Sequence, residues 1–288
     1  MGNGAGLGDL DARTCRFGGP VIMRKKVLLA VLVLSFGGLL LAQKEEWEVQ
    51  RLFQDLSAHR QPPNNTEFVF ARIQFTSHGP GRRNFGGMRP CMPDIPYGRV
   101  CGWAHDYPSA EENILQIARE ATGINLSKDS YAIVRMDSDD LFKYPFGLLS
   151  EVGEMTLTPK EAANFREYLN RGGFVMGDDF EGDNLQWFAE QMKLVWPDRS
   201  YVELTLDNPI FHTLYDIKTL DIAAPYPQQG LPKFYGYLDD HGRVSIVLNA
   251  NNDLGDFWEW VDEPRYPLPP STEGLRFGLD YILYSLTH

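Results

Sequence analysis

The feature that most constrains the fold is an alternation of short apolar segments with amphipathic segments, which runs from residue 67 to the end of the chain. Two apolar runs, 234–238 and 244–248, flank a polar turn and predict a β-hairpin. Together with the other runs they predict an α/β domain with a largely parallel sheet covered on both faces. Those other predicted strands lie at 67–75, 131–136, 146–149, 174–176 and 201–206.

Two capping boxes mark helix starts between these strands. Ser109 is followed three residues later by Glu112, and Gly123 is expected to end the helix that they begin. Thr158 and Glu161 have the same spacing, with proline at the first helical position. Each pair predicts that a side-chain oxygen accepts a hydrogen bond from a free N–H group of the first turn.

Two more helices complete the pattern. Asp183 is expected to cap one of them, and Pro197 is expected to stop it. The chain then ends on an amphipathic helix that follows the hairpin. Its apolar stripe consists of Leu275, Leu279, Ile282, Leu283 and Leu286.

A basic cluster and an apolar run near the N-terminus have the layout of a secretory signal. Residues 24–26 are Arg-Lys-Lys and precede sixteen uncharged, mostly apolar residues at 27–42. This layout places the probable true start at Met23. Sixteen helical residues span about 24 Å, less than the ~30 Å of a hydrocarbon core, which favours cleavage. We therefore expect an exported protein, periplasmic or secreted, with an N-terminal membrane anchor as the alternative if the signal is not cleaved.

The predicted domains follow from these boundaries. Residues 1–42 form an N-terminal extension and signal peptide, 43–66 a linker, and 67–288 a single α/β domain with a Gly/Pro-rich insert at 76–103. Of the 27 basic and 39 acidic side chains, residues 1–42 hold five and two, so the rest of the chain has 22 against 37. Nucleic acids and anionic lipid surfaces are excluded as partners, because both bind through cationic faces.

Two cysteines remain beyond the signal segment, and both lie in the insert. In an oxidising compartment, Cys91 and Cys101 are spaced to close a small loop disulfide. Two free thiols are the alternative interpretation.

The residues just beyond the strands are the ligand-binding candidates, because open α/β sheets bind ligands at the carboxyl ends of their strands. Polar and aromatic side chains gather after the predicted strands at 174–176 and 244–248, and ahead of the helix that begins at Ser109. These candidates are His105, Asp106, Tyr107, Asp178, Asp179, Asn252, Asp253 and Trp258.

Asp178, Asp179 and Asp253 are the candidate metal ligands. Carboxylates at neighbouring strand ends can hold a hard divalent cation such as Mg²⁺ or Ca²⁺. One of them, with its pKa raised by another, could serve as a general acid or base. Asp and Asn also favour turns and helix caps for local reasons, so a purely structural role stays open. The sequence establishes no cofactor, and a divalent cation is the one that it suggests.

Several other functions lack the residues that they need. The chain has no nucleophile elbow of the Gly-x-Ser-x-Gly type, no dinucleotide-binding glycine motif and no Walker-type phosphate loop. Its histidines are not spaced as a zinc motif, and we expect His212 to belong to a structural turn. Aromatic residues near the acidic turns could stack on glycans, although burial in the core is the favoured interpretation. They are Trp103, Tyr107, Tyr144, Phe180, Trp187, Trp258 and Trp260.

Several runs resemble an uncharacterised bacterial domain of unknown function. They are Asp106-Tyr107-Pro108 with Glu111, Tyr144-Pro145-Phe146, residues 157–179, His212, Asn252-Asp253 with Trp258, and residues 276–284. The resemblance spans roughly Phe68 to Leu286 and adds Glu111 to the ligand-binding candidates. The family is similar in fold to class I glutamine amidotransferase-like and trehalose-utilisation-type proteins, which implies a three-layer, flavodoxin-like domain.

An amidotransferase nucleophile would be expected on the turn after a strand such as 174–176. This chain has Gly177, Asp178 and Asp179 there and no cysteine. Glutamine amidotransferase activity is therefore not expected, and the resemblance implies a fold without an established reaction.

Three functional interpretations remain. The favoured one is a non-catalytic domain of the cell envelope that binds a small polar ligand, a glycan or a protein partner at the strand ends. The alternative is a carboxylate-dependent, metal-assisted hydrolase centred on Asp178, Asp179 and Asp253. A purely structural envelope protein is the third. The first is favoured because the chain has ligand-site geometry without a complete catalytic set.

Overall fold

The computed structural model describes residues 67–77, 102–126, 130–264 and 266–288. The predicted signal segment, the linker and most of the predicted insert, with Cys91 and Cys101, lie outside the described residues. Export, cleavage and the disulfide therefore stay predictions. No helix within the described ranges is long and apolar enough to cross a membrane.

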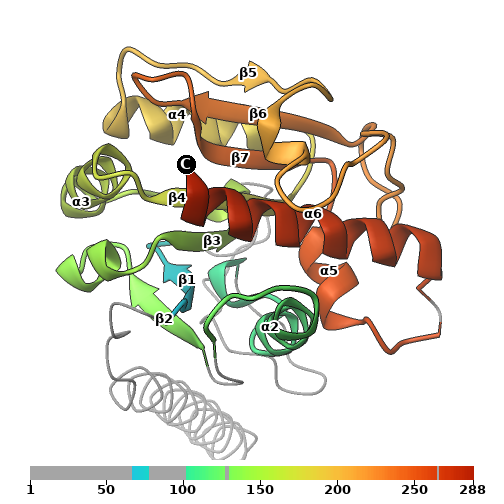
Figure 1. Cartoon of the computed structure of the whole chain (residues 1–288). Helices are drawn as coiled ribbons and strands as arrows, with labels where there is room; N and C mark the ends of the chain where they lie inside the picture. Colours follow the sequence, from blue (N-terminus) through green and yellow to red (C-terminus); the bar gives the residue numbers. More distant parts are fainter. Residues whose placement is uncertain (1–66, 78–101, 127–129, 265) are drawn as a thin grey trace, which may run out of the picture. The chain divides into compact units, whose positions relative to one another are not determined.

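Within the described residues, seven strands form one sheet in the order β2-β1-β3-β4-β7-β6-β5 (Figure 1). Strands β1, β2, β3, β4 and β7 pair in parallel, whereas β6 pairs antiparallel with β7 and β5. This confirms the predicted α/β domain with a mainly parallel sheet and a hairpin. The strands are β1 Phe70–Gln74, β2 Tyr131–Arg135, β3 Phe146–Ser150, β4 Phe174–Phe180, β5 Val202–Glu203, β6 Lys233–Leu238 and β7 Val244–Ala250.

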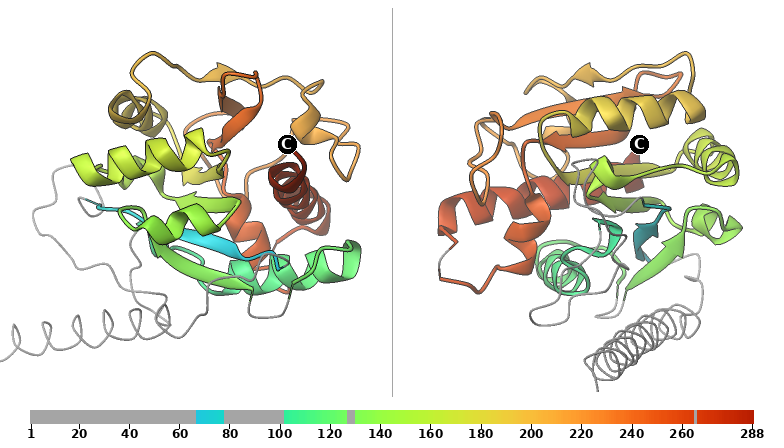
Figure 2. Two further views of the ribbon diagram at one scale, coloured as in Figure 1. Left: turned by 60° about the vertical axis from the view of Figure 1, so that its left-hand side comes forward. Right: turned by 180° about the vertical axis from the view of Figure 1, so that it is seen from behind.

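The described helices form two groups on opposite faces of the sheet (Figure 2). Helices α2, α5 and α6 contact one another on one face, and α3 and α4 contact each other on the other face. The helices are α2 Ser109–Ala121, α3 Pro159–Asn170, α4 Asn184–Val195, α5 Leu254–Glu259 and α6 Leu268–Thr287. Short 3₁₀ turns occur at η1 Gly102–Ala104, η2 Asp139–Lys143, η3 Val152–Glu154 and η4 Pro209–Phe211.

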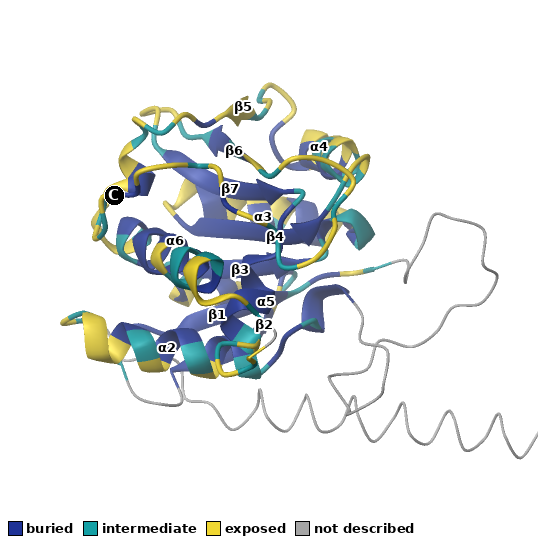
Figure 3. Cartoon of the chain, turned by 90° about the vertical axis from the view of Figure 1, so that its right-hand side faces the viewer, coloured by how far each residue is buried: buried dark blue, intermediate teal, exposed yellow. Residues whose placement is uncertain are grey.

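The core lies on both sides of the central strands. Every residue of β3, β4 and β7 is buried, which agrees with the mostly apolar sequences of these strands (Figure 3). Phe146 joins neighbouring strands, because its ring centroid lies 4.8 Å from that of Phe70 and 5.8 Å from that of Phe174. Of the seven aromatic residues near the acidic turns, Trp103, Tyr107, Tyr144, Phe180 and Trp258 are buried, as favoured, whereas Trp187 is half-buried and Trp260 exposed.

One predicted capping box is confirmed and the other is wrong. Thr158 Oγ1 accepts a hydrogen bond from the Glu161 N–H, and the Glu161 carboxylate accepts one from the Thr158 N–H. At α2, Pro108 occupies the cap position and Ser109 already lies inside the helix. The Glu112 carboxylate accepts a hydrogen bond from a tyrosine hydroxyl of β2, so a tertiary contact replaces the local one.

Two other helix ends lie at the predicted positions. Asp183 stands at the cap position of α4, as predicted, but its side chain makes no capping hydrogen bond. Helix α2 ends at Ala121 with Thr122 at its C-cap, so the predicted glycine, Gly123, directly follows the cap. The Ala118 carbonyl accepts hydrogen bonds from both the backbone N–H and the hydroxyl of Thr122, which closes the last turn of the helix.

Strand β4 is longer than predicted, which moves two candidate residues into the sheet. It continues beyond residue 176 through Asp178 and Asp179 to Phe180, because its last residues still pair with the ends of β3 and β7. The register with β7 shifts between Gly177 and Phe180, and Asp179 has a φ of 53°. This irregularity has the character of a β-bulge, which redirects a side chain at the end of a strand.

One further predicted element is shorter than expected. The strand predicted at 201–206 shrinks to the two exposed residues of β5, which lies at the sheet edge and pairs only with β6. The last two residues of the predicted insert at 76–103, Gly102 and Trp103, are buried and begin η1. The indole of Trp103 is 5 % exposed, so burial of a large ring draws this end of the insert into the core.

Asp280 connects α6 to the segment that follows η4. Its Oδ1 accepts hydrogen bonds of 2.8 Å from the N–H groups of Leu214 and Tyr215, and the residue is fully buried. Burial raises the pKa of Asp280 to about 6, although the two hydrogen bonds act to lower it. The folded state therefore binds this proton more tightly than the unfolded chain does. The resulting stability is present at low pH and is lost as the pH rises through about 6.

We predict that the wild type loses stability relative to Asp280→Asn as the pH rises from about 4 to about 7. Asparagine keeps an oxygen for both N–H groups but does not titrate in this range. Urea denaturation of the two proteins at several pH values measures the difference in their free energies of unfolding. A difference that stays constant with pH would contradict the raised pKa.

Candidate functional site

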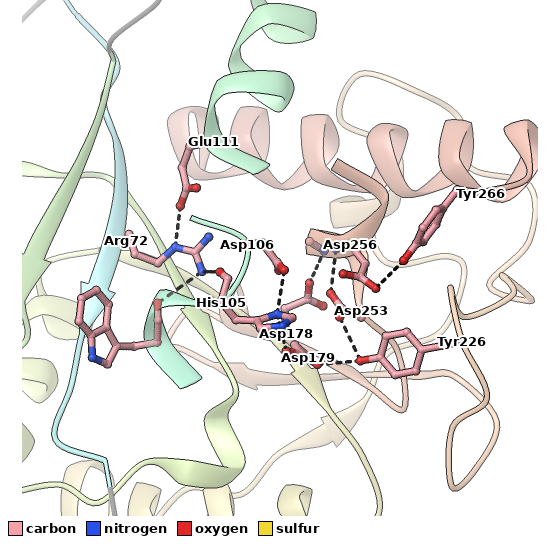
Figure 4. Close-up of polar contacts among 12 residues, drawn as sticks. Arg72, His105, Asp106, Glu111, Asp178, Asp179, Tyr226, Asp253, Asp256 and Tyr266 are labelled. Carbon is pink, nitrogen blue, oxygen red and sulfur yellow. Dashed lines mark hydrogen bonds and ion pairs between the residues drawn. The ribbon is translucent and has the colours of Figure 1, made fainter. Parts of the chain in front are cut away.

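Carboxylates from three parts of the chain converge at the carboxyl ends of β4 and β7 (Figure 4). Two of them belong to β4, and two belong to the cap and first turn of α5, directly after β7. The remaining members lie in the turn between η1 and α2. We call this group the strand-end cluster, and it consists of His105, Asp106, Asp178, Asp179, Asp253 and Asp256.

The His105 ring lies against two carboxylates. Its Nδ1 atom is 2.7 Å from Asp106 Oδ1 and 3.1 Å from Asp179 Oδ2. Both oxygens are buried, and neither accepts a directed hydrogen bond from any described residue, the histidine ring included. The contact is therefore an ion pair shared by two carboxylates. The side chain of His105 is 35 % exposed, so it reaches the surface of the cluster.

Two tyrosine hydroxyls meet the cluster from the loops. The Tyr226 hydroxyl lies 2.9 Å from Asp179 Oδ1 and 3.0 Å from Asp253 Oδ2. It has one proton, so it donates to only one of these carboxylates at a time. The Tyr266 hydroxyl donates to Asp256 Oδ2 over 3.2 Å. The carboxylates of the cluster therefore have more acceptor atoms than these hydroxyls can satisfy.

The segment that carries Tyr226 is held to the ends of β4 and β7. The backbone N–H and side-chain amide of Gln229 both donate to the Glu181 carboxylate. The Asn251 side chain donates to the Leu231 carbonyl and accepts from the Gly182 N–H. These contacts position the Tyr226 ring beside the cluster.

Asp178 has a different environment from the other carboxylates. Its Oδ1 accepts a hydrogen bond of 2.9 Å from the Asn249 amide, and its Oδ2 accepts one of 2.8 Å from the Gly255 N–H. Only 1 % of the residue is exposed. Burial raises the pKa of Asp178 to about 8 despite both hydrogen bonds. Its contacts join β4 to β7 and to the start of α5.

The charges of the cluster do not balance. Burial and the neighbouring Asp179 and Asp106 carboxylates raise the pKa of Asp253 well above its usual range. Burial and Asp106 raise the pKa of Asp256 to about 7. Burial lowers the pKa of His105, but contacts with Asp106 and Asp179 outweigh it and raise this pKa, which favours the imidazolium. One imidazolium therefore faces several carboxylates that are buried and close together.

The backbone around the cluster is strained. The non-glycine residues with positive φ in the described ranges are Asp106, Glu151, Asp179 and Asn251, at φ values of 52–65°. Glu151 and Asn251 directly follow β3 and β7, Asp179 lies near the end of β4, and Asp106 lies in the turn before α2. Residues other than glycine rarely adopt a positive φ, and this backbone geometry persists only where the surrounding structure imposes it. Such strain is concentrated at functional sites in proteins.

A fully buried ion pair lies beneath the turn that carries His105. Arg72, in the middle of β1, donates from Nε to Glu111 Oε1 of α2 over 2.6 Å. Its Nη1 atom donates to the His105 carbonyl over 2.8 Å and more weakly to the Trp103 carbonyl at 3.4 Å. Arg72 therefore holds η1 and the start of the turn through their carbonyls, and α2 through the Glu111 side chain.

The structure brings together some of the predicted site residues. His105, Asp106, Asp178, Asp179 and Asp253 all lie in the strand-end cluster. Their functional roles stay predictions, as does the predicted metal set of Asp178, Asp179 and Asp253.

The other candidates make structural contacts. Glu111 pairs with Arg72, and the Tyr107 ring packs edge-on against Tyr131 with a centroid distance of 5.8 Å. Trp258 is fully buried and its indole N–H donates to the Gly274 carbonyl. The Asn252 side chain accepts a hydrogen bond from the N–H of its neighbour Asp253. His212 contacts Asp216 and the Leu206 carbonyl, in agreement with the predicted structural turn.

Sequence reasoning missed three residues that shape the site. Arg72 had a signal, because a lone arginine inside an otherwise apolar strand must find a buried partner. Asp256 had a weaker signal, because it lies three residues after Asp253 at the start of a helix. Tyr226 had no sequence signal, because it lies in a proline-rich loop whose path depends on contacts with residues distant in the sequence.

Comparison with known proteins assigns the chain to a family. Residues 94–286 match the model of a family described as domain of unknown function (DUF4159). The chain belongs to this family. The matched region contains the whole strand-end cluster of the DUF4159 domain. It begins after β1, and so after Arg72, whereas the resemblance seen in the sequence begins at Phe68. No curated protein matches the chain.

We predict that Glu111→Ala lowers the free energy of unfolding by about 3–5 kcal/mol, because it leaves the Arg72 guanidinium buried without its counter-charge. The double variant Arg72→Met/Glu111→Leu should be destabilised by less than the sum of its single variants, because no charge is left unpaired. Urea denaturation of the wild type, Arg72→Met, Glu111→Leu and the double variant gives the coupling energy. Strictly additive effects would show that the pair does not act as a unit.

Proposed function

We propose that the DUF4159 domain is a ligand-binding domain whose strand-end cluster takes up a cationic group. The observation that carries this proposal is the convergence of Asp106, Asp179, Asp253 and Asp256 around a single imidazole. Each of these carboxylates is at most 6 % exposed. Buried carboxylates are stable when ionised only if a cation or enough hydrogen-bond donors face them. A cationic ligand supplies the charge that the surrounding residues do not.

A three-layer, flavodoxin-like and glutamine amidotransferase-like fold is part of the same proposal. Taken in chain order, the parallel strands have the spatial order second, first, third, fourth and fifth, which is the flavodoxin-like order. In such sheets ligands bind beyond the carboxyl ends of the strands, close to where the strand order reverses. The chain has Asp178 and Asp179 where an amidotransferase would carry its cysteine, which argues for binding and against ammonia release.

We place this domain outside the cytoplasm, in the periplasm or secreted. The support is the basic cluster at 24–26 followed by the apolar run at 27–42. Its partner there is a small polar ligand, a glycan or an envelope protein that presents a cationic group to the cluster. The acidic balance of the chain fits such a partner and disfavours nucleic acid.

A carboxylate-dependent hydrolase is the second candidate, and one observation favours it. His105 is partly exposed while its Nδ1 atom lies against Asp106 and Asp179, so its other ring nitrogen could exchange a proton with a substrate. A hydrolase would need a turnover reaction that His105→Gln abolishes. A binding domain would show no turnover on a broad panel of ester, amide and glycoside substrates.

We predict that at least one member of a cation panel raises the melting temperature of the purified chain. The panel contains Mg²⁺, Ca²⁺, Mn²⁺, Zn²⁺, spermidine and ethanolamine. A ligand present at about 100 times its Kd adds about 2.7 kcal/mol of stability, which corresponds to roughly 5–10 °C for a domain of this size. Differential scanning fluorimetry measures the shift.

Two variants control this experiment. Asp253→Asn should abolish most of the shift, because it removes a cluster charge while asparagine can still cap α5. Asp198→Asn removes an exposed carboxylate elsewhere and should leave the shift unchanged. If no cation stabilises the wild type, or if both variants respond alike, the cluster is not a cation-binding site.

A further inference from the structure

We infer that the ligand of the strand-end cluster is a divalent metal ion held by His105, Asp106, Asp253 and Asp256. This inference rests on the proposed function, because it names the cation that the same site would bind. It also differs from the metal set that the sequence suggests, since two of the three residues in that set are replaced.

The geometry of these residues suits one ion. Each offers one ligand atom, and the four atoms all lie within 4.8 Å of one another. Two ligands on opposite sides of an ion, with bonds of about 2.0–2.4 Å, are separated by about 4.0–4.8 Å. The ligand atoms therefore already lie within the width of one coordination sphere. They come from two separate backbone segments, the turn before α2 and the start of α5.

The burial of the ligand atoms separates this group from ordinary surface acids. Asp106, Asp253 and Asp256 are 2 %, 0 % and 6 % exposed. Asp106 Oδ1 accepts no directed hydrogen bond from a described residue, although it lies deep beside the His105 ring nitrogen. A buried carboxylate oxygen whose contact is an ion pair rather than a directed hydrogen bond can also serve as a ligand of a metal ion. Figure 4 shows this oxygen and the ring facing each other in the middle of the cluster.

Asp178 is not a ligand in this arrangement. It does not belong to the group whose ligand atoms lie within 4.8 Å of one another, and its oxygens accept hydrogen bonds from the N–H groups of Asn249 and Gly255. Asp179 lies next to the ligand set, with one oxygen beside the His105 ring and the other in contact with the Tyr226 hydroxyl. It would orient the imidazole and add negative charge close to the ion.

The donor set indicates which ion fits. Three carboxylate oxygens favour hard ions such as Mg²⁺, Ca²⁺ and Mn²⁺, whereas imidazole nitrogen favours softer first-row metals. Mn²⁺ accepts both kinds of donor. The Tyr266 hydroxyl, which contacts Asp256, would hold that ligand in place from outside the coordination sphere.

Mn²⁺ binding to the purified chain tests this inference. The protein carries no polyhistidine tag and is treated with a chelator beforehand. Isothermal titration calorimetry should show one site, and pulsed electron paramagnetic resonance should show nitrogen coupling from a bound imidazole. Asp256→Asn and Asp106→Asn should each weaken Mn²⁺ binding by at least about 10-fold, because each removes a charged ligand. Asp198→Asn should bind as the wild type does.

His105→Gln provides the most specific variant. Its side chain is partly exposed, so its loss should leave the fold intact, which circular dichroism checks. Mn²⁺ that remains bound to this variant should show no nitrogen coupling. The coupling in the wild type is measured on unaltered protein and so stays informative even if a variant fails to fold.

The outcomes separate this inference from the function on which it rests. Mn²⁺ binding without nitrogen coupling, or with unchanged affinity in Asp256→Asn, would overturn the ligand set and leave a cation site in place. Stabilisation by spermidine or ethanolamine with no divalent ion bound would overturn the metal and keep the proposed function. If neither metal nor organic cation binds, both proposals fail.

Discussion

The ion pair between Arg72 and Glu111 determines where the candidate site can form. Arg72 lies in the middle of β1, between two neighbouring strands, and its guanidinium cannot reach water. A buried cation of this kind needs a counter-charge and acceptors for its N–H groups. Glu111 supplies the charge from α2, and the carbonyls of Trp103 and His105 supply acceptors. An electrostatic requirement inside the core therefore places α2, and with it the turn that carries His105, against the sheet.

The strand-end cluster shows what the rest of the fold must support. Its carboxylates come from separate strand ends, and their proximity opposes ionisation. The residues with positive φ, such as Asp106 and Asp179, add backbone strain at the same place. The apolar strands and the aromatic contacts between them stabilise the domain enough to maintain this arrangement. A site that opposes folding in this way is more easily explained by ligand binding than by structural need.

The predictions made from the sequence agreed with the structure where a residue pattern was compatible with only one local structure. The Thr158 capping box formed as expected. The strand-end rule selected Asp178, Asp179 and Asp253, which lie in one cluster, while their role as a site stays a prediction. They failed where a side chain had two possible partners. Glu112 had the spacing of a capping box but contacts β2, and Asp183 occupies a cap position without making the bond. Local patterns cannot rank a nearby N–H group against a distant hydroxyl, because the distant group is placed only by folding.

The sequence by itself determined the elements, their mainly parallel arrangement and the polar character of the strand ends, because hydrophobic periodicity and burial on both sheet faces leave few alternatives. Only the tertiary structure decided which polar residues meet. It placed Tyr226 between Asp179 and Asp253, added Asp256 to the cluster and enclosed Asp178 among N–H donors. The hydrogen bonds of Tyr226 and Asp178 join residues that are 27 to 77 positions apart in the sequence. Asp256, by contrast, lies only three positions after Asp253. Such contacts depend on how loops pack across the sheet, for which the chain carries no local signal.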